Sequence, residues 1–227
     1  GPSFPRTTLK GGLGVFYQPP QPQESAPVFG QLGLVSNRAV HYSLGVEREF
    51  TKNIEVSTEA FYKQLDNLVV AGNLNAGRGR VYGVETLIRY KPDSHFFGWL
   101  AYTLSRSERQ DTPADAVRLA NFDQTHILNF AASYEFDGWR FGASFQLTTG
   151  RPTLSVCGAT YRADANEYDA TFCDRGERLP TYHQLNVRID RDFNIANTIL
   201  GSVYLDVLNV YYAQNAEGLV YQKPMSR

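Results

Sequence analysis

The sequence predicts an all-β fold of antiparallel strands. Apolar and polar residues alternate with a period of two along most of the chain, while helical periodicity is nearly absent. No run reaches the roughly 18 apolar residues that a membrane helix needs. The 227 residues are 42% hydrophobic and 13% aromatic and carry a formal charge of −1. This composition argues against a disordered chain and against a nucleic-acid-binding protein, which usually has a basic excess.

About nine strands are expected. The clearest pair is a hairpin whose strands, 125–136 and 139–147, are joined by Asp137-Gly138, the strongest two-residue hairpin signal. In each strand every second residue is apolar, so the hairpin has one apolar face. The other expected strands cover residues 7–18, 41–50, 54–63, 82–90, 100–104, 184–193 and 203–207.

The connections between these strands alternate in length. Short connections are expected near residues 51–53, 92–96, 137–138 and 194–198. Long connections are expected near residues 19–38, 65–79, 108–124 and 150–181. A soluble sandwich has no reason to place every long loop at one end. An outer-membrane barrel does, because short turns face the periplasm and long loops face outside.

The polar face of the strands is rich in charge. It carries Glu47, Glu49, Glu55, Glu59, Lys63, Glu85, Arg89, Arg140, Arg188, Asp190 and Asp192. A small barrel or sandwich could not bury so many charges without a large desolvation cost. A wide barrel could, because this face would line a wet lumen or contact a plug while the apolar face meets lipid.

Aromatic residues mark both ends of the strands. One group lies beside the short turns: Phe50, Tyr90, Phe97, Phe136, Trp139 and Phe193. The other group lies near the opposite ends: Tyr17, Tyr62, Tyr211 and Tyr212. Two such rings are the girdles expected at the membrane–water boundaries of a transmembrane β-barrel. An aromatic-rich soluble β-protein is the alternative, but it explains neither the loop asymmetry nor the charged face.

Several segments resemble the C-terminal barrel region of TonB-dependent outer-membrane receptors, and together they cover most of the chain. They are Tyr82-Gly83-Val84-Glu85, Tyr90-Lys91-Pro92, Ala101-Tyr102-Thr103-Leu104-Ser105-Arg106-Ser107, Phe122-Asp123-Gln124-Thr125-His126, Gly150-Arg151-Pro152-Thr153, Leu179-Pro180-Thr181-Tyr182-His183-Gln184-Leu185 and Asp206-Val207-Leu208-Asn209-Val210-Tyr211. None is decisive alone; their order and spacing carry the resemblance.

The resemblance implies a 22-strand barrel in the Gram-negative outer membrane, an N-terminal plug domain and a short box that pairs with TonB. Residues 1–227 would then be one part of the barrel, with the plug, the box and the final strand outside this chain. The odd number of strands agrees with this. In a sheet of nine antiparallel strands the first and last strands run the same way, so they cannot close an all-antiparallel barrel. Open sheet edges in lipid would leave backbone groups without hydrogen bonds. Other residues of the same receptor, or another polypeptide, would complete the wall.

Two groups of candidate site residues follow. Arginines at loop or outer strand positions suit anionic ligands such as ferric siderophores: Arg78, Arg80, Arg106 and Arg151. Contact with anionic lipopolysaccharide or with loop carboxylates is the alternative. Charges of the lumen face are candidates for contact with the plug or with neighbouring strands: Glu47, Glu59, Glu85, Arg89, Arg140 and Arg188.

Cys157 and Cys173 lie in one polar stretch, and such a pair predicts a loop disulfide in an oxidising compartment. Two free thiols are the alternative. The four histidines have no metal-ligand spacing, so neither a metal nor another cofactor is expected. No nucleophile elbow is present, and an enzyme is not expected.

The expected function is therefore binding and active import of a bulky nutrient, such as a ferric siderophore, through a plugged barrel. The expected partners are outer-membrane lipid and lipopolysaccharide, the plug and remaining strands, TonB through its box, and a small ligand of unknown identity. One alternative is a barrel of the same descent that serves as a non-transporting component of a multi-protein assembly. An outer-membrane enzyme is the remaining alternative.

Overall fold

The computed structural model describes residues 6–26, 30–70, 72–164, 166–173, 176–195, 199–216 and 218. The described residues form one short helix, α1 (Pro22–Ser25), and twelve strands. The strands are β1 (Thr7–Gln18), β2 (Asn37–Glu49), β3 (Ile54–Val70), β4 (Leu74–Tyr90), β5 (Phe96–Gln110), β6 (Arg118–Leu119), β7 (His126–Phe136), β8 (Trp139–Thr148), β9 (Ser155–Arg162), β10 (Glu167–Cys173), β11 (Tyr182–Ile195) and β12 (Ile199–Val207). Within these ranges, no helix is long and apolar enough to cross a membrane.

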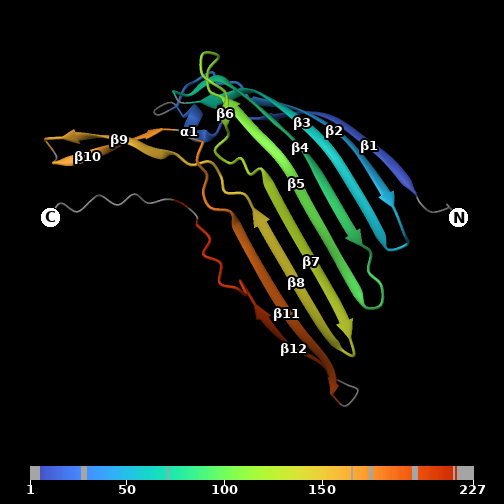
Figure 1. The fold of residues 1–227 in the computed structure, drawn as a ribbon. Helices are drawn as coiled ribbons and strands as arrows, with labels where there is room; N and C mark the ends of the chain where they lie inside the picture. The colour runs from blue at the N-terminus through green and yellow to red at the C-terminus, as the bar shows by residue number, and fades with distance from the viewer. Residues whose placement is uncertain are drawn as a thin grey trace.

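One sheet dominates the molecule (Figure 1). Its strands follow the order β1-β2-β3-β4-β5-β7-β8-β11-β12, and β6 pairs with β5 beside this path. Every pairing is antiparallel. This confirms the predicted all-β antiparallel fold with nine strands in the wall. Within the described chain, β1 and β12 form the two edges of the sheet.

The strand register sorts side chains into two faces. On one face, Leu44 of β2 lies opposite Ala60 of β3, which lies opposite Val84 of β4, which lies opposite Leu104 of β5. We call this the apolar face, and the face that carries the residues between them the polar face. Leu44, Val84 and Leu104 are respectively 68%, 40% and 44% exposed, although they lie in the middle of the sheet. The apolar face is thus uncovered by any part of the described chain.

The surface area gives the same result. The chain exposes 15939 Å², whereas a compact monomer of its mass would expose about 10,000 Å². In the described part of the chain, Leu179 is the only buried hydrophobic residue. The sheet therefore does not enclose a core of its own, and its apolar face requires an apolar environment.

The apolar face of β3 and β4 also has a defined length. On β3 it runs from Ile54 to Tyr62, and on β4 from Tyr82 to Tyr90, with Ile54 opposite Tyr90 and Tyr62 opposite Tyr82. No charged residue occupies this face between those limits. Each stretch is nine residues long, which matches the 9–11 residues that a tilted transmembrane strand needs. Tyr62, Tyr82 and Tyr90 supply aromatic rings at its ends.

The structure corrects one expected connection. Residues 65–79 do not form a long loop, because β3 continues to Val70 and β4 begins at Leu74. The register shifts between Leu65 and Leu68, where Asn67 has a positive φ of 57°. This bulge interrupts the alternation in the sequence, although pairing with β4 continues beyond it. At this end of β3 and β4, the sheet itself extends outward in place of a loop.

Residues 150–181 contain a second sheet, the hairpin β9–β10. Figure 1 shows it projecting away from the main sheet. The structure does not contain the predicted disulfide between Cys157 and Cys173. The register explains this: Cys173 lies opposite Ser155, and the thiol of Cys157 donates a hydrogen bond to the carbonyl of Thr171 at 3.5 Å.

Candidate lumen face and extracellular mouth

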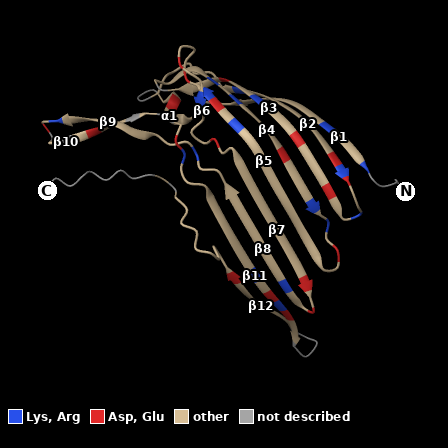
Figure 2. Cartoon of the chain, in the orientation of Figure 1, with Lys and Arg blue, Asp and Glu red and all other residues tan. Residues whose placement is uncertain are grey.

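All six residues predicted for the lumen lie on the polar face. Glu47 is on the same face as Glu59, which lies opposite Glu85, and Arg89 follows four residues later on β4. Arg140 lies opposite Asp190, and Arg188 shares that face of β11. The continuous register from β2 to β11 therefore joins residues that are far apart in sequence. Figure 2 marks the charged residues of both faces along the strands and shows that the middle of β7 and β8 carries none.

Ion pairs link the charges near the short turns. Lys91 Nζ lies 2.6 Å from Glu49 Oε1 and 3.0 Å from Glu55 Oε2. Arg89 Nη1 lies 3.4 Å from Glu55 Oε1. Lys10 pairs with Glu47 on the neighbouring strands. Two of the predicted residues, Glu47 and Arg89, thus have partners within the wall itself.

A second group of ion pairs lies on β7, β8 and β11, and Tyr204 of β12 adds a ring contact. Arg188 Nη2 lies 2.8 Å from Asp190 Oδ1, and its guanidinium also stacks over the ring of Tyr204 at 4.1 Å. Arg140 Nη2 lies 3.4 Å from Asp192 Oδ2 and 3.6 Å from Glu135 Oε2. The predicted Arg140 and Arg188 are therefore fixed in position by carboxylates of the same face.

Glu59 and Glu85 differ from the other four. They lie directly opposite each other on β3 and β4, and none of the ion pairs among the described residues involves either carboxylate. Directly opposed like charges destabilise a sheet. A cation placed between these carboxylates would remove that cost, so the pair is the part of the polar face best suited to receive a positively charged partner.

The turn between β4 and β5 is held by Asp93. Its carboxylate accepts hydrogen bonds from the hydroxyl of Tyr90 at 2.7 Å and from the backbone amides of His95 and Phe96 at 2.8 and 2.7 Å. The hydroxyl, followed by the two amides, lowers the pKa of Asp93 from 3.8 to about 2. These bonds close the turn between two transmembrane strands and set the aromatic rings of Tyr90 and Phe96 4.9 Å apart.

At the opposite end, a buried ion pair joins two long connections. Asp123 is 1% exposed, and its Oδ2 lies 2.5 Å from Arg178 Nη2. Arg178 also donates to the carbonyl oxygen of Gly150 at 3.0 Å, while the amide of Ser107 donates to Asp123 Oδ1 at 2.6 Å. We call this set of contacts the loop clasp. The sequence pattern gives no sign that Asp123 and Arg178 meet, although Asp123 lies in one of the family-like segments.

The loop clasp borders a cavity of about 450 Å³. Its lining includes Gln146, Thr148 and Tyr182 from the polar face, together with Arg151 and Leu179 from the connection after β8. Gly150 belongs to this lining, and a side chain there would run into the backbone of Leu179. The cavity thus lies where the polar face meets the long connections.

Of the four arginines predicted to bind ligand, Arg151 alone borders this cavity. The register places the other three on the apolar face: Arg80 lies opposite Gln64 and Glu108, Arg106 lies opposite Tyr82, and Arg78 lies two residues beyond Arg80. The sequence does not separate Arg151 from the other three arginines, because a position near a loop does not reveal which face of the sheet a side chain occupies. In the described part of the chain, no group of three His, Cys, Asp or Glu side chains could hold a metal ion.

An open antiparallel sheet with one charged face and one bare apolar face of transmembrane length is a piece of the wall of an outer-membrane β-barrel. A family model described as TonB dependent receptor-like, beta-barrel, matches residues 3–210. The chain therefore belongs to the β-barrel family of TonB-dependent receptors, as the sequence resemblance predicts, and its place is the Gram-negative outer membrane.

Solved structures have the same fold. The outer membrane transporter YddB from Escherichia coli matches with a TM-score of 0.60 at 12% identity, over 81% of this chain and 30% of that chain. The FrpB iron transporter from Neisseria meningitidis (F3-3 variant) matches with a TM-score of 0.64 at 13% identity, over 94% of this chain and 34% of that chain. The chain thus spans about a third of each transporter, and it is a partial barrel. No curated protein sequence matches it.

Proposed function

We propose that this chain forms part of the barrel of a receptor that binds a bulky nutrient at the extracellular mouth and imports it with energy supplied through TonB. The observation that carries the proposal is the cavity of about 450 Å³ at the outer end of the polar face, in a chain whose family consists of TonB-dependent receptors. The loop clasp makes this end of the wall a fixed surface. Recognition residues commonly occupy loops held by such a rigid scaffold.

We assign ligand contact to Arg151. It borders the cavity together with the polar side chains of Gln146 and Tyr182. A guanidinium binds anionic oxygen atoms by paired hydrogen bonds, so a ferric siderophore with exposed catecholate or carboxylate oxygens is a suitable ligand. The iron transport stated for the FrpB structure supports this choice of ligand class.

We assign plug contact to Glu59 and Glu85. These opposed carboxylates face the lumen without a cation from the described wall, so an arginine of a plug domain would complete them. Glu47, Arg89, Arg140 and Arg188 lie on the same face but pair with neighbouring side chains. Their contribution to plug contact would be to keep the lumen polar and wet.

Uptake by cells tests the transport proposal. Cells that express the full receptor would be given catecholate or hydroxamate siderophores loaded with radiolabelled iron, with and without TonB. We expect uptake of at least one siderophore that requires TonB and falls about tenfold in Arg151→Gln, through loss of a charge-assisted contact. Arg48→Gln is the matched control, because Arg48 is exposed at the far end of the sheet. Uptake that persists without TonB would overturn the proposal.

A separate measurement tests plug contact. The double variant Glu59→Gln/Glu85→Gln removes both unpaired carboxylates while it preserves their size. We expect the plug of the full receptor to become more sensitive to protease and less stable to urea, with the barrel unchanged. Asp115→Asn is the control, since Asp115 is an exposed carboxylate in the connection after β5. An unchanged plug in the double variant would contradict the assignment.

A further inference from the structure

Four arginines gather on the apolar face at one end of the sheet: Arg38, Arg78, Arg80 and Arg106. We call them the arginine cluster. The register fixes their face, since Arg38 lies opposite Asp66, Arg80 opposite Glu108 and Arg106 opposite Tyr82. The same face carries the bare hydrophobic residues farther down the strands. These arginines therefore point away from the lumen, toward the surroundings of the barrel.

Their height relative to the bilayer follows from the aromatic residues. Tyr42, Tyr62 and Tyr82 lie opposite one another on β2, β3 and β4 and end the uncharged stretch of the apolar face. Arg80 lies two residues beyond Tyr82, and Arg38 lies four residues beyond Tyr42. Two residues along a strand correspond to about 7 Å, which is the step from the hydrocarbon boundary into the headgroup layer. The long connections lie at this end, so the layer is that of the outer leaflet.

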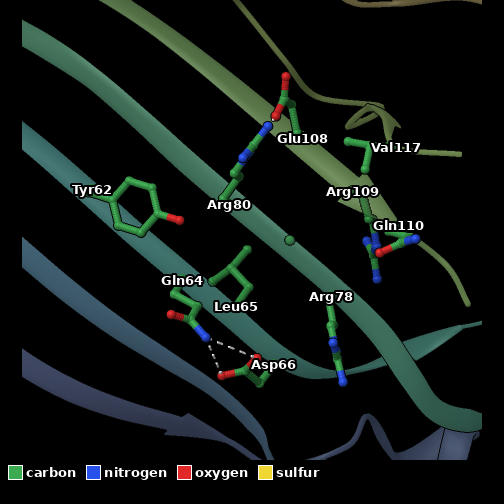
Figure 3. Close-up of a pocket in the computed structure, with 11 residues that line it drawn as sticks. Tyr62, Gln64, Leu65, Asp66, Arg78, Arg80, Glu108, Arg109, Gln110 and Val117 are labelled. Carbon is green, nitrogen blue, oxygen red and sulfur yellow. Dashed lines mark hydrogen bonds and ion pairs between the residues drawn. The ribbon is translucent and has the colours of Figure 1, made fainter. Parts of the chain in front are cut away.

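The guanidinium groups are held in place and remain accessible. The carboxylate of Glu108 accepts hydrogen bonds from Arg80 Nε at 2.5 Å and from Arg106 Nε at 2.7 Å, and the Glu108 side chain is only 9% exposed. The side chains of Arg80 and Arg106 are 51% and 56% exposed. A guanidinium has five N–H donors, so each arginine keeps donors for an anion after its bond to Glu108. Figure 3 shows Arg80 reaching Glu108 from β4, with Arg78 on the same strand.

The cluster has an excess of positive charge. Its four arginines face two carboxylates, Asp66 and Glu108, which leaves a net charge of +2. Two arginines of the cluster, Arg78 and Arg80, line a groove of about 230 Å³, and its lining also includes Tyr62. The groove thus combines an aromatic residue of the membrane boundary with cationic groups above it. Such a groove is chemically complementary to a lipid that carries a phosphate group next to its acyl chains.

We propose that the arginine cluster binds a phosphate group of the phosphorylated glycolipid of the outer leaflet, with Tyr62 and Tyr82 against the adjoining sugar and acyl chains. Arginine binds phosphate by paired hydrogen bonds, and basic clusters at a membrane boundary bind anionic headgroups. The inference depends on the outer-membrane location of the chain and is independent of import. It assigns Arg78, Arg80 and Arg106 to a lipid site outside the barrel.

The test uses the full receptor, purified in detergent and titrated with bis-phosphorylated lipid A. The double variant Arg78→Gln/Arg106→Gln is informative because it leaves Glu108 paired with Arg80 and Asp66 paired with Arg38. We expect its affinity for lipid A to fall about tenfold or more. Arg48→Gln is the control, because Arg48 lies on the same face at the opposite end, beside Phe50. Its affinity is expected to match that of the unaltered receptor.

Two further probes separate the possible ligands. Lipid A without phosphates is expected to bind as weakly to the unaltered receptor as bis-phosphorylated lipid A binds to the double variant. Inorganic phosphate at the same concentration is expected not to displace lipid A. Equal binding of the dephosphorylated lipid, displacement by inorganic phosphate, or full affinity in the double variant would each overturn the proposal. Resistance of the folded barrel to sodium dodecyl sulfate shows that the variants are intact.

Discussion

Strands β3 and β4 pass through two environments on the same face. Between Tyr82 and Tyr90, every outward side chain of β4 is uncharged, and Val84 and Ile88 are 40% and 43% exposed. Beyond Tyr82 the same alternation presents Arg80 and Arg78. Backbone pairing between β3 and β4 continues on both sides of Tyr82. Backbone hydrogen bonding therefore sets the length of the sheet, whereas the surroundings set the chemistry of each segment of its surface.

The two segments are also stabilised differently. The uncharged segment has bare apolar side chains, so lipid supplies its stabilising contacts. The outer segment has polar contacts within the protein, such as the bond between Arg80 and Glu108. The loop clasp stabilises the long connections at the same end of the wall. Substitutions in the two segments should therefore lower the free energy of unfolding for different reasons.

The largest effect is expected from the loop clasp. In Asp123→Ala, the guanidinium of Arg178 would lose its carboxylate partner, and the free energy of unfolding should fall by about 3 kcal/mol. Urea denaturation of the refolded full receptor measures the change. Asp115→Ala is the control, because Asp115 is an exposed carboxylate in the same connection. Equal effects of the two variants would show that the outer end does not depend on the clasp.

A charge within the uncharged segment should have the next largest effect. Val84→Arg places a guanidinium against hydrocarbon between Tyr82 and the middle of the stretch, and we expect a loss of about 2 kcal/mol in the free energy of unfolding in lipid vesicles. Gln64→Arg, on the same face beyond Tyr62, should change it by less than about 0.5 kcal/mol. If both substitutions had the same small effect, the boundary between the segments would be misplaced.

The smallest effect is expected at the short turn. The depressed pKa of Asp93, about 2 against 3.8, means that its ionised form stabilises the fold. This contribution is complete above pH 3.8 and is lost as the pH falls from 3.8 to about 2. The unaltered receptor should have a higher melting temperature than Asp93→Asn. This difference should shrink as the pH falls from 3.8 to about 2 and stay constant above pH 3.8. A constant difference between the two proteins would contradict the assignment.

Much of the wall was predictable from the sequence. Alternation identified the nine strands, and the charges from Glu47 to Arg188 share the predicted face. The extension of β3 and β4 was not predictable, because the bulge at Asn67 breaks the alternation while backbone pairing continues. Nor was the loop clasp, whose partners Asp123 and Arg178 meet only through the folded connections.

Neighbouring residues of one strand point to opposite faces of the sheet, so a pair of them tests which face meets lipid and which meets water. A nitroxide spin label would be attached through Val84→Cys or Glu85→Cys in a full receptor whose native cysteines are replaced by serine, in lipid vesicles. We expect the label at 84 to be relaxed mainly by molecular oxygen, from lipid, and the label at 85 mainly by a water-soluble nickel chelate. Equal access of the chelate to both labels would contradict this expectation.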